Sequence, residues 1–161
     1  MKFKVVLKDE YLSNKNKYLN DLRVLYLNDN SKLANIEMIE KHLNFIFTIS
    51  NSLLVLLYDN DKLVSMVNGY EYNNINHDWC IFSLFTNKEY RNHGLGYKVL
   101  EYIIEEIKKY NHNIIISGIE QDNISSIKLH ERIGFVNSGM KWDEIEPGFP
   151  NNHLGFIYKA K

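Results

Sequence analysis

The sequence predicts a mixed α/β fold, and two observations support this prediction. The chain has 161 residues, of which 45% are hydrophobic and 24% charged, so it can bury a sizeable core. β-prone runs alternate with amphipathic segments through its second half. Because no repeat, linker or low-complexity tract interrupts the chain, we expect a single domain over residues 1–161.

The first half of the chain predicts a strand, two helices and a hairpin. Residues 3–7 form a short β-prone run, after which apolar residues recur at helical spacing over residues 19–26 and again over residues 36–47. Residues 53–58 and 63–72 are strand-like runs on either side of an Asp-Asn-Asp turn cluster, which predicts two strands joined as a hairpin.

The second half predicts alternating strands and helices. Residues 79–86 are nearly continuous in apolar and β-prone residues, as expected of a central strand covered on both faces. A short helix over residues 124–133 is expected to begin at a cap, Asp122 or Asn123, and to end at Gly134. The other expected elements are an amphipathic helix over residues 95–110 and strands over residues 113–118, 135–145 and 153–158.

Composition argues against several classes of protein. The chain has 19 Lys and Arg against 20 Asp and Glu, so it lacks the positive charge that drives duplex binding, and we expect no nucleic acid partner. A single cysteine, Cys80, cannot form an intrachain disulfide or a cysteine-rich metal site. The longest apolar run, residues 53–58, is far shorter than the ~20 residues that cross a bilayer. We therefore expect a cytoplasmic protein without a membrane span or a metal.

The loop between the central strand and the long helix has the features of a phosphate-binding turn. Gly94 and Gly96 let backbone amides approach a ligand closely, and the helix that follows supplies unpaired N–H groups and the positive end of its dipole. Arg91 adds a positive charge, and His93 can add a partial one. The pattern is also compatible with a tight strand-to-helix turn and a solvated arginine.

Two rival phosphate motifs fit less well. In a dinucleotide-binding fingerprint Glu120 would hold the ribose, but Val99 occupies the place of the third glycine and too little chain follows. A P-loop requires Gly-Lys-Ser/Thr, which the sequence lacks.

A second motif, Asn123-Ile-Ser-Ser-Ile-Lys-Leu-His-Glu-Arg-Ile-Gly-Phe135, follows downstream. With it, the chain resembles the GNAT (GCN5-related) N-acetyltransferase superfamily, whose members pair an Arg/Gln-x-x-Gly-x-Gly/Ala loop with a later Asn…Leu-Tyr-x-Lys/Arg-x-Gly-Phe segment. Both motifs occur in order, and the expected element order matches that fold over essentially the whole chain. The resemblance thus implies an α/β fold with a central mixed β-sheet flanked by helices.

The resemblance implies an acetyl-CoA-dependent N-acetyltransferase in which the primary amine of a small molecule or peptide attacks the thioester directly. An alternative from another class is a catalytically idle acyl-CoA-binding or sensory domain. A purely structural α/β domain would require both motifs to be coincidental.

The resemblance also assigns the coenzyme A contacts. The backbone of residues 91–96 would hold the pyrophosphate, residues 84–86 would bind the pantetheine arm like an added strand, and a gap between strands 79–86 and 113–118 would admit the thioester. No metal is implied. The implied cofactor-binding residues are Leu84, Phe85, Thr86, Arg91, Asn92, His93, Gly94, Leu95, Gly96, Asn123, Ser126 and Leu129.

The chain departs from the family at His130, where the family often has a tyrosine proposed to protonate the departing thiolate. Spacing puts His130 on the inward face of its helix with Ser126 and Ile133. An imidazolium with an ordinary pKa of ~6.5 can donate near neutrality, and a thiolate whose acid has a pKa of ~8.5 leaves easily. His130 is therefore a candidate acid, with a packing or cofactor-contact role as the alternative.

The attacking amine must be neutral, so a base is needed. Asp78, at the start of the central strand, and Glu120, just past its neighbour, are the carboxylates expected nearest the cleft, and Glu71 is a more distant one. The alternative for each of the three is an exposed loop or strand-end charge. Cys80 is expected to be a buried structural thiol, because the family needs no acyl-enzyme.

Acceptor specificity is expected to come from the two-helix segment and the closing hairpin. The aromatic candidates could instead pack in the core. The acidic candidates could attract a cationic amine, with a solvated strand edge as the alternative. By analogy with the family, a homodimer is possible. The acceptor-site candidates are Tyr26, Trp142, Phe149, Asp143, Glu144 and Glu146.

Overall fold

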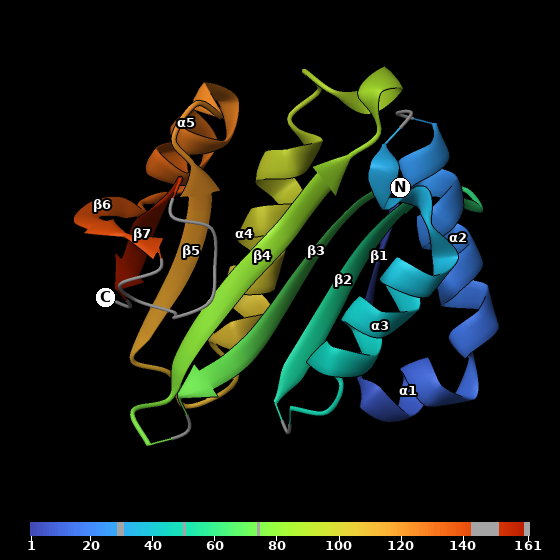
Figure 1. The fold of residues 1–161 in the computed structure, drawn as a ribbon, viewed down its shortest axis with the longest axis horizontal. Coiled ribbons are helices and arrows are strands. Elements are labelled where there is room, and N and C mark those ends of the chain that lie inside the picture. The colour runs from blue at the N-terminus through green and yellow to red at the C-terminus, as the bar shows by residue number, and fades with distance from the viewer. Residues whose placement is uncertain (29–30, 50, 74, 143–151, 160–161) are drawn as a thin grey trace.

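Seven strands form one sheet in the order β1-β2-β3-β4-β5-β7-β6 in the computed structural model, which describes residues 1–28, 31–49, 51–73, 75–142 and 152–159 (Figure 1). The strands are β1 (Lys2–Val6), β2 (Ser52–Asp59), β3 (Lys62–Asn73), β4 (Asp78–Thr86), β5 (Ile114–Glu120), β6 (Val136–Lys141) and β7 (His153–Lys159). The helices are α1 (Lys8–Ser13), α2 (Lys15–Leu27), α3 (Ile36–Ile46), α4 (Leu95–Ile107) and α5 (Ile124–Ile133), with 3-10 turns η1 (Lys32–Ala34) and η2 (Lys88–Tyr90).

The sheet is mixed, as the sequence predicts. Strands β4 and β5 run parallel, and the other neighbouring pairs are antiparallel. Strand β7 enters between β5 and β6, so the last strands are not in chain order. This insertion places Glu120, at the end of β5, opposite His153, at the start of β7.

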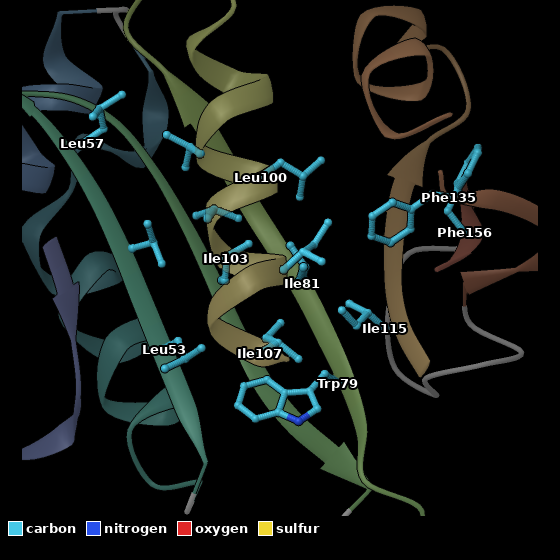
Figure 2. Packing of buried hydrophobic residues seen from close by; sticks show 14 of the residues in the cluster. Leu53, Leu57, Trp79, Ile81, Leu100, Ile103, Ile107, Ile115, Phe135 and Phe156 are labelled. Atoms are coloured by element: carbon cyan, nitrogen blue, oxygen red, sulfur yellow. The ribbon is translucent and has the colours of Figure 1, made fainter. Parts of the chain in front are cut away.

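Helices cover the two faces of the sheet unequally. Helix α4 packs on one face, where Leu100, Ile103 and Ile107 meet apolar side chains of β2, β4 and β5 such as Leu53 and Ile81 (Figure 2). Helices α1, α2 and α3 pack on the opposite face of β2 and β3. A third, smaller cluster continues that second face onto β4 and β5 and consists of Tyr70, Cys80, Ile116 and Trp142.

Local signals set the bounds of several elements. Helix α5 has the predicted bounds because Asn123 caps its first turn, accepting from the Ser126 N–H at 3.2 Å, and Gly134 ends it with φ +115°. The predicted hairpin is present as β2 and β3. Helix α1 was not predicted, because its sequence, Lys-Asp-Glu-Tyr-Leu-Ser, has no apolar periodicity and buries only Tyr11.

The expectation that β4 is covered on both faces is wrong for its second half. Residues Asp78 to Ile81 are buried, whereas Ser83 is exposed and residues 84 and 85 are only half-buried. The reason is that β5 stops pairing with β4 at Ile81. Strand β3 is instead the most continuously buried strand, from Leu63 to Glu71.

The part of the chain that the structure describes contains no helix long and apolar enough to span a membrane. The candidates Asp143, Glu144, Glu146 and Phe149 lie outside the described residues.

Candidate active site

The site begins where β4 and β5 separate. The two strands pair only at residues 79–81 of β4, and Figure 1 shows them moving apart from there toward α5. Strand β4 is also irregular at this point: its register against β3 shifts between Met66 and Asn68, and Ser83 adopts a left-handed conformation with φ +55°. The gap that the sequence analysis expected between these strands is therefore present.

A cavity of about 530 Å³ lies between the end of β4, the start of α4 and α5; we call it the loop cavity. All of the implied cofactor-binding residues line it except His93. The lining residues that the sequence analysis missed are Tyr90, Tyr97 and Ser125.

The loop before α4 contains two residues in the left-handed backbone conformation. Asn92 and Gly94 have positive φ angles, +64° and +74°, and Gly94 is the N-cap of α4, whose first turn has no side-chain cap. Arg91 is fixed by its Nε, which donates to the Thr86 carbonyl at 2.9 Å, and its guanidinium lies 5.7 Å from the Phe85 ring. First-turn N–H groups, the helix dipole and a guanidinium thus meet at one cavity, a combination suited to an anion.

Gly96 brings the backbone close to this cavity. A Cβ there would lie 3.5 Å from Thr86 Oγ1 and 3.9 Å from Leu129 Cδ2, both on side chains that line the loop cavity. The residues present therefore fit the pyrophosphate of coenzyme A, which needs close approach of the backbone and a positive field.

A second cavity, of about 270 Å³, occupies the space between the separated strands; we call it the gap cavity. It shares Leu84, Asn123 and Ser126 with the loop cavity, so the two cavities adjoin. Its walls also carry the polar and titratable side chains Ser83, Ser117, Glu120, His130 and His153.

His130 points inward, as its spacing predicts, and is 2% exposed. Its Nδ1 lies 2.8 Å from the Ser126 carbonyl oxygen, which can only accept, so Nδ1 carries the proton. Its Nε2, which is then unprotonated, lies 3.3 Å from Ser117 Oγ and accepts a hydrogen bond from that hydroxyl.

Burial lowers the pKa of His130, and the hydrogen bond to Ser126 opposes this shift only in part. This shift favours the neutral form of the His130 ring, so it works against the role of proton donor that the sequence analysis considered. A neutral ring can accept a proton at Nε2, and His130 is one of the residues that line the gap cavity.

The structure separates the candidate carboxylates. Glu120 is exposed at the end of β5 and lines the gap cavity. Asp78 is at the other end of β4, buried and bonded to Asn113 Nδ2 at 3.3 Å, and is not brought to the gap cavity. Glu71 accepts a hydrogen bond from Asn51 Nδ2 at 2.6 Å, and its other carboxylate oxygen lies 2.7 Å from His77 Nδ1. Glu71 does not line the gap cavity either.

A third cavity, of about 440 Å³, lies on the face of the sheet that carries α3; we call it the aromatic cavity. It shares Phe82, Ser83, Gly118 and His153 with the gap cavity. Trp142, an expected acceptor-site residue, lines it, whereas Tyr26 lines a separate cavity of about 160 Å³. The full lining is His42, Phe45, Tyr70, Cys80, Phe82, Ser83, Gly118, Trp142 and His153.

His42, on α3, is a site residue that the sequence analysis missed. Its Nε2 lies 3.2 Å from Asn68 Nδ2 and 3.4 Å from Ser83 Oγ, and burial lowers its pKa. One sequence signal could have identified His42: it lies beside Ile39 and Leu43, which form the apolar face of α3. In the described part of the chain, no group of three or more His, Cys, Asp or Glu could hold a metal ion.

Comparisons with known proteins bear on this arrangement. A model of the acetyltransferase (GNAT) family matches residues 19–135, which include β4, the α4 loop and α5.

Curated relatives match over a shorter stretch. The L-methionine sulfoximine/L-methionine sulfone acetyltransferase of Salmonella typhimurium is 34% identical over 54 residues, which are 34% of this chain and 32% of the relative. The L-amino acid N-acyltransferase MnaT of Escherichia coli is 33% identical over 54 residues, 34% of this chain and 31% of the relative. The chain thus spans about a third of the length of these relatives.

Solved structures match along nearly the whole chain. The ribosomal-protein-alanine N-acetyltransferase of Brucella melitensis has a TM-score of 0.72 at 18% identity, covering 99% of this chain and all of that one. The Salmonella typhimurium protein yncA, solved with its cofactor acetyl-CoA, has a TM-score of 0.69 at 13% identity, covering 100% of this chain and 94% of that one. At these identities the likeness shows the fold.

Proposed function

Because the chain belongs to the acetyltransferase (GNAT) family, we propose that it is an acetyl-CoA-dependent N-acetyltransferase that acetylates the primary amine of a small molecule. The observation that carries the proposal is the arrangement of the three cavities: the gap cavity, between β4 and β5, shares lining residues with the loop cavity and with the aromatic cavity. A donor and an acceptor entering from these two ends would meet beside His130.

The loop cavity would hold the donor. Backbone N–H groups of Gly94, Leu95 and Gly96, with Arg91, would bind the pyrophosphate, since they join a helix N-terminus to a fixed cation. Beyond Ile81, β4 does not pair with β5, which leaves residues 84–86 beside the cavity for the extended pantetheine arm. Acetyl-CoA, when bound, supplies an activated acetyl thioester.

The reaction joins the amine to the acetyl group. The neutral amine attacks the carbonyl carbon, the C–N bond forms, and the C–S bond breaks. His130 Nε2 accepts the proton that the amine nitrogen loses and returns it to the sulfur, so that the ring ends neutral as it began. Glu120, exposed at the mouth of the gap, would first deprotonate the arriving ammonium, and backbone N–H groups of β4 would stabilise the oxyanion.

The acceptor is proposed to be a small amine because the aromatic cavity, at about 440 Å³, suits a small molecule. The curated relatives, named for amino acid substrates, support a small amine acceptor. We also place the protein in the cytoplasm, since the lone cysteine is a buried free thiol.

One observation favours a second candidate, an idle acyl-CoA-binding domain. The proton that neutral His130 carries is bonded to the Ser126 carbonyl and is not available to a leaving thiolate. Turnover therefore depends on His130 first accepting a proton from the amine.

The test is a calorimetric titration with acetyl-CoA followed by a thiol-release assay on a panel of primary amines. Saturable binding with amine-dependent thiol release supports the enzyme. Binding without thiol release for any amine supports the idle domain, and absence of binding refutes the donor site itself.

A further inference from the structure

We propose that the acceptor is a primary amine that carries an aromatic or comparably bulky apolar group and no carboxylate. The inference rests on the proposed function and concerns the aromatic cavity, whose lining the sequence analysis anticipated only at Trp142.

The aromatic cavity is walled by rings from three separate elements. Phe45 of α3 meets Tyr70 of β3 edge-on with centroids 6.2 Å apart, and Tyr70 meets Phe82 of β4 edge-on at 5.3 Å. A fourth ring, that of Trp142, packs directly on the β5 backbone, because a Cβ at Gly118 would lie only 2.6 Å from the indole. Rings arranged in this way favour apolar and aromatic groups in the space between them.

The polar groups of this cavity are few. Besides the Tyr70 hydroxyl, the Trp142 indole N–H and the Cys80 thiol, they are Ser83 and His153, which also line the gap cavity, and His42, whose Nε2 lies near Ser83 and Asn68. This distribution orients an acceptor: its amine would lie at the gap, where the thioester enters, and its apolar group would lie among the rings.

The lining is poorly suited to a carboxylate. Among the described residues that line the aromatic cavity there is no lysine or arginine, and burial disfavours the charged form of His42. An α-carboxylate moved into this space would lose its hydration without gaining a fixed cation. The chemistry therefore distinguishes this chain from relatives named for free amino acids.

The separate 160 Å³ cavity beside His42 is a weaker candidate for the acceptor. The smaller cavity shares only Ser83 with the gap cavity. The aromatic cavity shares four residues with the gap cavity, including Gly118 and His153. The smaller cavity adjoins the aromatic cavity, with which it shares His42 and Ser83.

The test compares amines that differ only in the carboxylate: phenethylamine with phenylalanine, tyramine with tyrosine, and tryptamine with tryptophan. We expect kcat/KM to favour each amine by at least about tenfold over its amino acid, because the carboxylate is desolvated without a partner. Equal or better turnover of the amino acids overturns the inference while leaving the proposed function intact, and so does turnover confined to amines without an apolar group.

Two variants on α3 sharpen the test. Phe45→Ala removes a 56% exposed ring of the aromatic cavity and should raise KM for phenethylamine about fivefold or more without changing KM for acetyl-CoA. Met38→Ala is the matched control: Met38 lies on the same helix, is 55% exposed, and lines the separate smaller cavity. Equal effects of the two variants contradict the inference.

A binding measurement separates this inference from the proposed function. Trp142 lines the cavity, so phenethylamine should change the tryptophan fluorescence saturably even where no thiol is released. If phenethylamine binds saturably, Phe45→Ala weakens this binding and no thiol is released, the aromatic cavity is supported as a binding site and the proposed acetyltransferase activity is refuted. If no matched amine binds or reacts, the inference is wrong.

Discussion

Replacing Gly96 with alanine should affect the fold and the binding of acetyl-CoA in opposite directions. Gly96 lies in the first turn of α4, and the structure gives it no positive φ. The added methyl would meet Thr86 Oγ1 at 3.5 Å, an ordinary contact distance, so no steric penalty is expected. Alanine is the better helix former, by up to about 1 kcal/mol. The free energy of unfolding should therefore stay level or rise.

The same methyl faces the loop cavity at the point where the pyrophosphate would approach the backbone. Loss of one hydrogen bond from a backbone N–H to a charged group costs about 1.5–3 kcal/mol. The dissociation constant for acetyl-CoA should accordingly rise by at least about tenfold, since ~1.4 kcal/mol corresponds to a factor of ten.

Calorimetric titration with acetyl-CoA and urea denaturation of the same preparations measure the two effects. Glu101→Ala, an exposed position on α4 that does not line the cavity, is the control for a change in this helix. Unchanged affinity in Gly96→Ala, or a loss of stability as large as the loss of binding energy, would refute the assignment of this turn as the pyrophosphate site.

Three further predictions concern His130, pH and Gly118. His130→Gln should lower kcat about 100-fold with little change in the dissociation constant of acetyl-CoA, because it removes the proton acceptor but keeps a polar side chain; steady-state kinetics with calorimetry checks this. The pKa of His42 and of His130 is lowered by burial, so the unfolded chain takes up protons near pH 6.5 before the folded chain does. The free energy of unfolding should be at its full value above about pH 7 and should fall below pH 6.5 by up to about 2.7 kcal/mol per pH unit for the two groups together. Urea denaturation at pH 7.5 and 5.5 checks this, and the decrease between the two pH values should be smaller in His130→Gln than in the unmodified protein. Gly118→Ala should destabilise the fold by about 1–3 kcal/mol, because its methyl would overlap the Trp142 indole; an unchanged denaturation midpoint contradicts this packing.

The elements that could be predicted from the sequence are those set by local signals. Helix α5 has a side-chain cap at Asn123 and a left-handed glycine at Gly134, and both can be identified from the residues alone. The alternation of strands and helices in the second half of the chain and the inward direction of His130 likewise follow from periodicity.

The features that escaped prediction depend on pairing between distant segments. Strand β7 inserts between β5 and β6, and no local pattern specifies a partner so far along the chain. The second half of β4 has the same apolar composition as the first, yet it borders cavities because β5 leaves it after Ile81. A continuous apolar run cannot distinguish a packed face from a cavity wall.

The candidate site shows the same division. The loop cavity is built largely from two contiguous motifs, and the sequence predicted most of its lining. The aromatic cavity is assembled from α3, β3, β4, β5, β7 and Trp142, and residues such as His42 and His153 were not anticipated. The pKa of His130 also depends on how deeply the side chain is buried. The spacing of the helix indicated that the side chain points inward, but not how completely it is buried.

The central claim is that the acetyl group moves from acetyl-CoA to an amine within this fold. The most direct measurement is the ratio of N-acetyl product to free thiol, followed by nuclear magnetic resonance with acetyl-CoA labelled in the acetyl group and phenethylamine as acceptor. The account predicts one amide for each thiol released, with release dependent on the amine. Thiol release that yields free acetate at the same rate with or without the amine would contradict it.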